Sequence, residues 1–275
     1  MLVRLQGLTM WLSMAALTCA TVLYAYYFLS KRASHSRYAT AFTGAGFLLL
    51  TASIGLYSSA TQGSRLFGPY SLVLAAWALV FAYFVVEHLV KLKVFGTVLV
   101  PVALVLLVLA QMLLPAAAGL KPTPEEIRQL ADWRVTVHVV LIVFANAGFA
   151  IGAAASATYL ALEAQLKRHR TSTLFKRLPS LAQTDLVARR AVSWAYPAYS
   201  AGLLLGILRA IETDVSGWWA DPRVMLSGAV WGIFSVYLYL HYGRETSGRT
   251  TAYLALVGLV FVVALAVVAR TVPAG

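Results

Sequence analysis

The sequence predicts an all-α fold, a polytopic membrane helical bundle of about eight transmembrane helices that forms a single integral membrane domain over residues 1–275. Of the 275 residues, 60% are hydrophobic and only 12% are charged, whereas soluble domains have about 45–50% and about 25%. The mean hydropathy is correspondingly high, at +0.77. Because one spanning helix needs about 20 residues, eight spans take up about 160 of them. The remainder is too short for a large catalytic domain outside the membrane.

Eight uninterrupted apolar stretches are each long enough to cross a bilayer. They run over residues 9–29, 40–60, 69–90, 94–114, 135–164, 192–211, 224–242 and 250–270. The first stretch follows a short N-terminal segment, as the apolar part of a secretory signal does. It is nevertheless longer than the ~7–15 apolar residues of such a signal. We therefore expect it to be a spanning helix.

The distribution of lysine and arginine predicts the orientation of the spans. Fourteen of the 22 basic residues fall in alternate connections, and the connection over residues 165–190 is the richest in them. Basic connections stay on the cytoplasmic side, which places both termini outside and makes the chain a multi-pass protein of the inner (plasma) membrane. The formal net charge of +12 is then an orientation signal, and it requires membrane lipid but no nucleic acid as a partner.

Two connections are long enough to have structure of their own. In the outer one, 115–134, a threonine, a proline and two acids at 123–126 are typical of a helix start and predict a short interfacial helix. The inner one, 165–190, is basic and polar, and we expect it to be partly helical. It is suited to contact anionic lipid or a cytoplasmic partner, although a topology anchor is the simpler interpretation.

Small residues one helical turn apart occur in three spans. Such pairs let another helix, or a flat ligand, approach closely, and helix packing is the simpler interpretation. The pairs are Gly148 and Gly152, Gly202 and Gly206, and Gly228 and Gly232.

The residues that could carry chemistry are histidines. The single cysteine, Cys19, excludes an intrachain disulfide and a cysteine zinc site, and hydrolytic or phosphate-binding motifs are absent from the sequence. His138 lies near the outer end of the fifth span, whereas His88 and His241 lie near the inner ends of the third and seventh. An imidazole at such a depth needs a hydrogen bond or a metal. Two histidines at one depth could supply the opposed nitrogens of a bis-histidine haem.

A tryptophan-rich segment follows the sixth span. Trp218 and Trp219 precede Asp221 and Arg223, and Arg209 lies at the end of the span before them. Adjacent tryptophans at an interface are usually part of an aromatic belt. With the nearby arginines they could instead hold a flat macrocycle with two carboxylates, which would stack on indole and pair with guanidinium groups.

With these motifs, the sequence resembles the haem-handling cytochrome c assembly family of CcsA-, CcmC- and HemX-like membrane proteins over about residues 66–270. The family's W-x-W-D-P-K/R-E segment is matched at Trp218, Asp221, Pro222 and Arg223. Its P-x4-G-x3-G-x3-A span is matched at Pro197, Gly202, Gly206 and Ala210, and its Y-L-H-x-R ending resembles the run from Tyr239 to Arg244. His138 opens a helix as the family's outer histidine does.

The departures from the family concern the outer site. Ala220 stands in place of the second motif tryptophan and Val224 in place of the following glutamate. No histidine follows the last span before Gly275. We therefore expect an outer haem to have His138 as its protein ligand here, with the opposite ligand supplied by a partner chain or an exogenous group.

The resemblance implies a function in cytochrome c maturation. The chain would bind b-type haem non-covalently near the inner face through His88 and His241, and present it outside at Trp218–Arg223 with His138 as ligand, without bond-making chemistry of its own. A second cytochrome c assembly membrane protein would hold apocytochrome c. The alternative is a HemX-like regulator that acts on a cytoplasmic tetrapyrrole-synthesis enzyme without exporting haem. A small-solute transporter would need more mid-membrane polar groups than Asn146.

Overall fold

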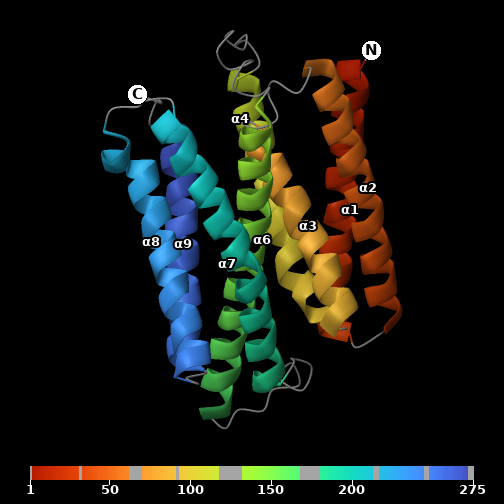
Figure 1. The fold of residues 1–275 in the computed structure, drawn as a ribbon. Helices are drawn as coiled ribbons and strands as arrows, with labels where there is room; N and C mark the ends of the chain where they lie inside the picture. Colours follow the sequence, from red (N-terminus) through yellow and green to blue (C-terminus); the bar gives the residue numbers. More distant parts are fainter. Residues whose placement is uncertain are drawn as a thin grey trace. The chain divides into compact units, whose positions relative to one another are not determined.

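The computed structural model describes residues 2–30, 33–61, 70–90, 93–117, 132–167, 180–212, 217–244 and 248–271. Eight α-helices make up most of these ranges (Figure 1), and no strand occurs within them. The helices are α1 Leu2–Ser30, α2 Ala33–Thr61, α3 Ser71–Val90, α4 Gly96–Ala117, α6 Trp133–Lys167, α7 Leu181–Glu212, α8 Pro222–Leu238 and α9 Arg249–Thr271. The predicted all-α fold is confirmed.

Seven of these helices are long and apolar enough to cross a membrane, and α4 contributes a shorter apolar stretch, Gly96–Met112. The chain is therefore a multi-pass membrane protein, close to the predicted eight spans. The side of the membrane on which each end lies stays a prediction.

The helix bounds differ most from the prediction at the start of α7. A span was expected from residue 192, but α7 already begins at Leu181. The reason is a capping box: Ser180 Oγ accepts a hydrogen bond from Gln183 N, and Gln183 Oε1 accepts one from Ser180 N, both at 3.2 Å. The connection 165–190 is thus partly helical, as predicted. Its residues 168–179, like the predicted interfacial helix after residue 122, lie outside the described residues.

The N-terminal unit contains α1 to α4 and forms its own compact body. Helix α1 packs along α2, where a Cβ atom at Gly46 would come within 2.9 Å of Leu17, and Ser13 Oγ donates a hydrogen bond to the Gly46 carbonyl at 2.8 Å. At Gly96, the first residue of α4, a Cβ atom would lie 2.6 Å from the ring of Tyr24 on α1. The absence of a side chain at both glycines therefore sets how closely these helices approach.

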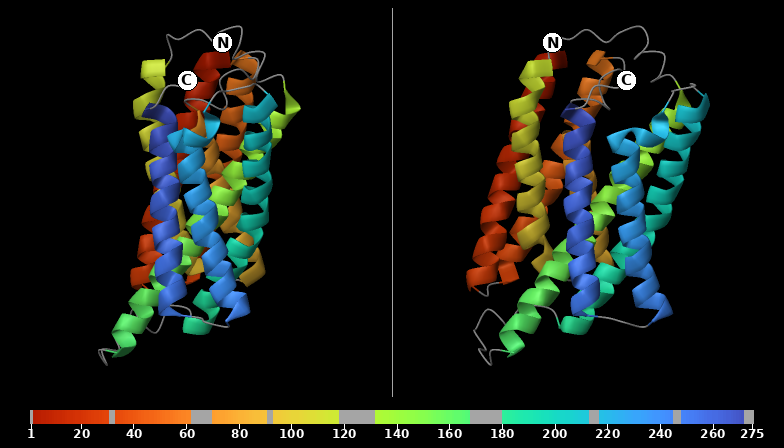
Figure 2. Two further views of the ribbon diagram at one scale, coloured as in Figure 1. Left: turned by 60° about the vertical axis from the view of Figure 1, so that its left-hand side comes forward. Right: turned by 90° about the vertical axis from the view of Figure 1, so that its left-hand side faces the viewer.

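The C-terminal unit contains α6 to α9, and α8 runs beside α9 in each view (Figure 2). Phe149 on α6 stacks on Phe234 of α8 with the ring centroids 3.7 Å apart. On α6, Cβ atoms at Gly148 and Gly152 would lie 2.7 Å from Ala195 and Val192 of α7. The helix-packing prediction is confirmed for this glycine pair. It is not confirmed for Gly228 and Gly232, which have no described neighbour within 4 Å of such a Cβ atom.

Candidate functional site

The side chain of His138 on α6 is held by the backbone of α7. Its Nδ1 atom lies 2.6 Å from the carbonyl oxygen of Gly202. Because a carbonyl only accepts hydrogen bonds, Nδ1 carries the proton, and in a neutral imidazole Nε2 is then the unprotonated nitrogen. A histidine whose other nitrogen donates to a carbonyl has the tautomer and orientation that metal-ligating histidines use.

The next glycine along α7 makes room for the same ring. A Cβ atom at Gly206 would lie 3.1 Å from Cε1 and 3.3 Å from Nδ1 of His138. Gly202 in turn faces Ile142 of α6, at 2.9 Å from a Cβ atom built there. The contact of Gly202 with Ile142 confirms helix packing at this pair, whereas the contact of Gly206 with His138 was not predicted. The sequence feature that could have indicated this contact is a pair of small residues one turn apart, in the span that follows the one containing His138.

Charged groups lie at the same end of α6 and α7. Arg134 Nη1 pairs with the Glu212 carboxylate at 2.6 Å, which joins the start of α6 to the end of α7. Both side chains are substantially exposed, so this ion pair stabilises the fold little. Arg209 is half-buried in the last turn of α7. Its helical spacing from Gly206 places it on the same face of α7, about one turn beyond the His138 ring.

The tryptophan-rich segment leads into α8 at this end. Gly217 has φ +74°, a left-handed conformation that side chains disfavour, and a 3₁₀ turn follows over Trp218–Ala220. Asp221 then caps α8: its Oδ1 accepts a hydrogen bond from Arg223 N at 2.7 Å, with Pro222 at the first helical position. The predicted ligand contact of Asp221 therefore competes with a capping bond that this carboxylate already makes.

The two indoles do not share a plane. The ring centroids of Trp218 and Trp219 are 6.3 Å apart and the ring planes are at 80° to each other. Trp219 is 67% exposed, whereas Trp218 is half-buried. A flat ligand can therefore stack on the face of one indole, and Trp219 is the one whose surface is accessible.

His241 lies in a different environment. Helix α8 continues into a π-helical turn, Tyr239–Gly243, which contains the histidine, and its side chain stacks on Tyr237 with the centroids 5.8 Å apart. The side chain is buried, with Nε2 at 3.5 Å from Asp185 Oδ2. Nδ1 is also buried and has no hydrogen-bond partner among the described residues. π-helical turns of this kind are frequent at functional sites.

Within the C-terminal unit, His138 and His241 lie far apart. His138 contacts Gly206 and His241 faces Asp185, and about 30 Å of α7 separates those two positions at 1.5 Å per residue. These two histidines therefore cannot bind the same iron. His88, in the last turn of α3, is exposed and belongs to the N-terminal unit. Its pairing with His241 on one haem stays a prediction.

A bare metal ion has no ready ligand cluster here. Within the described ranges, no three His, Cys, Asp or Glu side chains are grouped so that they could hold one. A single prepared imidazole instead fits a metal that brings most of its ligands with it, as the iron of a porphyrin does. The described residues at the His138 end are thus compatible with haem.

Known proteins of one family are similar to this chain over most of its length. The family model described as "Cytochrome C assembly protein" matches residues 65–272, a range that includes all of the candidate site residues. The cytochrome c biogenesis protein CcsA of Guillardia theta is 26% identical over 214 residues, which cover 70% of this chain and 68% of that protein. CcsA of Pyropia yezoensis is 22% identical over 271 residues, covering 81% and 84%. The HemX protein of Brevibacillus brevis is 34% identical over 105 residues, covering 38% and 39%. No solved structure matches the chain.

Proposed function

The chain belongs to the cytochrome c assembly protein family, and from this premise we propose that it binds b-type haem non-covalently at the His138 end of the C-terminal unit and presents it there for cytochrome c maturation. The distant relationship to CcsA proteins supports a role in cytochrome c biogenesis. The proposal concerns this chain's own contribution, which is to bind, orient and release haem.

One observation carries the proposal: the 2.6 Å contact of His138 Nδ1 with the Gly202 carbonyl. It leaves Nε2 as the nitrogen that can act as an axial ligand. When bound, haem supplies the iron that this nitrogen ligates and the propionates that attract cations. Gly206 keeps the space beside the ring open. Arg209 and Arg223 are placed along the chain to pair with propionates, and Trp219 offers a face for stacking.

The chain is not proposed to attach haem itself. Cys19 is the single cysteine of the chain and lies on α1, and we propose no role for it in haem attachment. Attachment would therefore fall to apocytochrome c held by a second cytochrome c assembly membrane protein. His138 is the one histidine at this end of the described C-terminal unit, so we propose that the opposite axial ligand comes from that partner or from an exogenous group.

An inner holding site is the second part of the proposal. The buried Nδ1 of His241 lacks a partner within the described part of the chain, and an unprotonated nitrogen of this kind can donate its lone pair to iron. His88 remains the less supported ligand because its side chain is exposed. Haem would be held first by His241, with or without His88, and then presented at the His138 end.

The haem spectrum of the purified protein tests the proposal. We expect His138→Ala to abolish the axial ligation at the outer site, with a shift of the Soret band and at least a tenfold weaker haem binding. His138→Gly should regain the ligation when imidazole is added to the solution. His35→Ala, which changes a histidine in the N-terminal unit, is the control. It should leave the Soret band and the haem affinity unchanged. Normal haem ligation in both His138 variants would sink the proposal.

A regulatory function is the alternative. The observation that favours it is the 34% identity to a HemX protein over 105 residues. As a regulator, the chain would contact a cytoplasmic tetrapyrrole-synthesis enzyme through the basic connection over 165–190, and it would not export haem. A deletion strain separates the two: unchanged cytochrome c with altered tetrapyrrole levels favours regulation, and loss of holocytochrome c favours assembly.

A further inference from the structure

A cavity lies in the N-terminal unit, beside His88. It is lined by Thr40 of α2, by Phe84, Glu87 and His88 of α3, and by Lys93, the first residue of a 3₁₀ turn before α4. Its volume is about 580 Å³, within the range of about 300–1,000 Å³ that small-molecule sites have. Thr40 and Glu87 belong to helices that are candidate membrane spans, and each lies near one end of its span.

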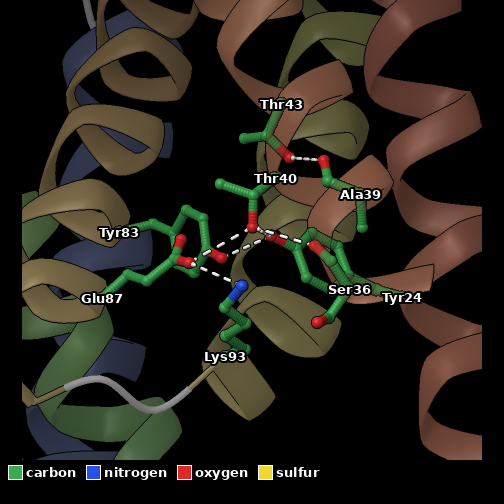
Figure 3. Close-up of polar contacts among 8 residues, drawn as sticks. All are labelled: Tyr24, Ser36, Ala39, Thr40, Thr43, Tyr83, Glu87 and Lys93. Carbon is green, nitrogen blue, oxygen red and sulfur yellow. Dashed lines mark hydrogen bonds and ion pairs between the residues drawn. The ribbon is translucent and has the colours of Figure 1, made fainter. Parts of the chain in front are cut away.

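The carboxylate of Glu87 contacts Thr40 and Lys93 through one of its two oxygens (Figure 3). Its Oε1 is 3.2 Å from the Thr40 hydroxyl, which is also 3.0 Å from the Ser36 carbonyl. A hydroxyl has one proton, so Thr40 can donate to only one of these acceptors at a time. Oε2 is buried and has no hydrogen-bond partner within the described part of the chain. Leaving a buried carboxylate oxygen without a donor is costly, and a donor brought by a ligand would remove that cost.

Lys93 supplies the opposite charge without satisfying the carboxylate. Its ammonium nitrogen is 3.8 Å from Glu87 Oε1, and its side chain is 33% exposed. This distance exceeds that of an N–H···O hydrogen bond, so the attraction is electrostatic only. An ammonium group has three donors, which can also bind an anionic group that enters the cavity.

The wall behind the Glu87 and Lys93 pair is held in place by phenols. The Tyr24 hydroxyl contacts the Tyr83 hydroxyl and lies 3.2 Å from Thr40 Oγ1 (Figure 3). Both rings are fully buried. The polar side of the cavity is therefore a connected cluster with little freedom to rearrange.

We propose that this cavity binds the headgroup of a phospholipid with a primary ammonium, the ethanolamine type. One carboxylate and one ammonium line the cavity, so a zwitterion matches both charges, whereas a purely anionic headgroup leaves Glu87 unpaired. A primary ammonium has N–H donors for Glu87, which a choline group lacks, and the phosphate pairs with Lys93. The first carbons of the lipid chains would lie against Phe84.

Nanodiscs of defined composition test this site. The full-length protein is reconstituted in phosphatidylethanolamine, phosphatidylcholine or phosphatidylglycerol, and the retained lipid is measured by native mass spectrometry. We expect wild-type protein to retain phosphatidylethanolamine about tenfold more strongly than phosphatidylcholine, the effect of one charge-assisted hydrogen bond. Soluble glycerophosphoethanolamine should compete, which shows that the headgroup is recognised.

Two variants assign the contacts. Glu87→Gln keeps the size of the side chain and should remove the preference for ethanolamine over choline. Lys93→Met should weaken retention of the three lipids alike, because each has a phosphate. Glu163→Gln is the control, since that carboxylate pairs with Lys167 at 2.6 Å in the C-terminal unit, and it should bind lipid as wild type does. Equal retention of the ethanolamine and choline lipids by wild-type protein would overturn the proposal. A Glu87→Gln protein that loses haem but keeps its lipid preference would overturn it as well.

Discussion

The ring of His138 and the backbone of Gly206 lie so close that a single methyl group at residue 206 would come within 3.1 Å of Cε1. This spacing is tighter than most Cβ contacts, and the imidazole cannot give way freely because its Nδ1 is bound to the Gly202 carbonyl. The arrangement makes Gly206 part of the candidate ligand site as well as part of the helix interface.

We therefore expect Gly206→Ala to displace the His138 ring and weaken haem binding about tenfold, while the protein stays folded. Gly228→Ala is the matched control, because no described atom lies within 4 Å of the added Cβ, and its haem binding should equal that of wild type. Haem titration followed by absorbance measures both. Equal binding by the two alanine variants would show that Gly206 does not support the ligand.

Variants of Asp221 can distinguish a role in capping α8 from a role in binding the ligand. Its side chain accepts a hydrogen bond from Arg223 N at the start of α8, so Asp221→Ala should lower the free energy of unfolding by about 1 kcal/mol. Asp221→Asn caps equally well and should restore stability. If the carboxylate served only haem, the asparagine variant would bind haem poorly and both variants would be as stable as wild type. Thermal unfolding with and without haem distinguishes these outcomes.

The perpendicular indoles predict unequal roles. Trp219 is 67% exposed and can offer its face to a flat ring. Trp218 is half-buried, and its ring packs edge to face against that of Trp219. We expect Trp219→Ala to weaken haem binding by roughly tenfold, and Trp219→Phe to retain most of it because an aromatic face remains. Trp218→Ala should chiefly lower thermal stability. A larger loss of haem in Trp218→Ala than in Trp219→Ala would reverse the assignment.

The helices could be predicted from apolar run lengths, because spanning a bilayer constrains composition strongly. The contact of His138 with Gly202 could not, because it depends on the register between α6 and α7. The cap at Asp221 was readable from the Asp-Pro pair but was interpreted as a ligand. Likewise, Ser180 and Gln183 at capping-box spacing mark where α7 begins, whereas hydropathy alone places the start later because the first turns are polar.

The environment of the Glu87 carboxylate could not be predicted from the sequence. Its environment is made by Thr40 of α2 and Lys93 after α3, and by the phenols of Tyr24 and Tyr83. None of these residues forms a motif along the chain. Their proximity follows from how three helices pack, and that packing is set in part by Gly96, which leaves space for the Tyr24 ring.

The close approach of α6 and α7 at Gly148 gives a stability prediction that is independent of haem. A Cβ atom at Gly148 would lie 2.7 Å from Ala195 Cβ and 3.2 Å from the Ala191 carbonyl, and neither of these atoms can move without shifting α7. Gly148→Ala should therefore destabilise the protein by roughly 1–3 kcal/mol, the usual cost of overpacking. Gly232→Ala, with no described neighbour near the added methyl group, should be neutral or stabilising by up to about 1 kcal/mol through helix propensity. Thermal unfolding of the haem-free protein in detergent measures both, and a Gly148→Ala protein as stable as Gly232→Ala would mean that α6 and α7 are farther apart than described.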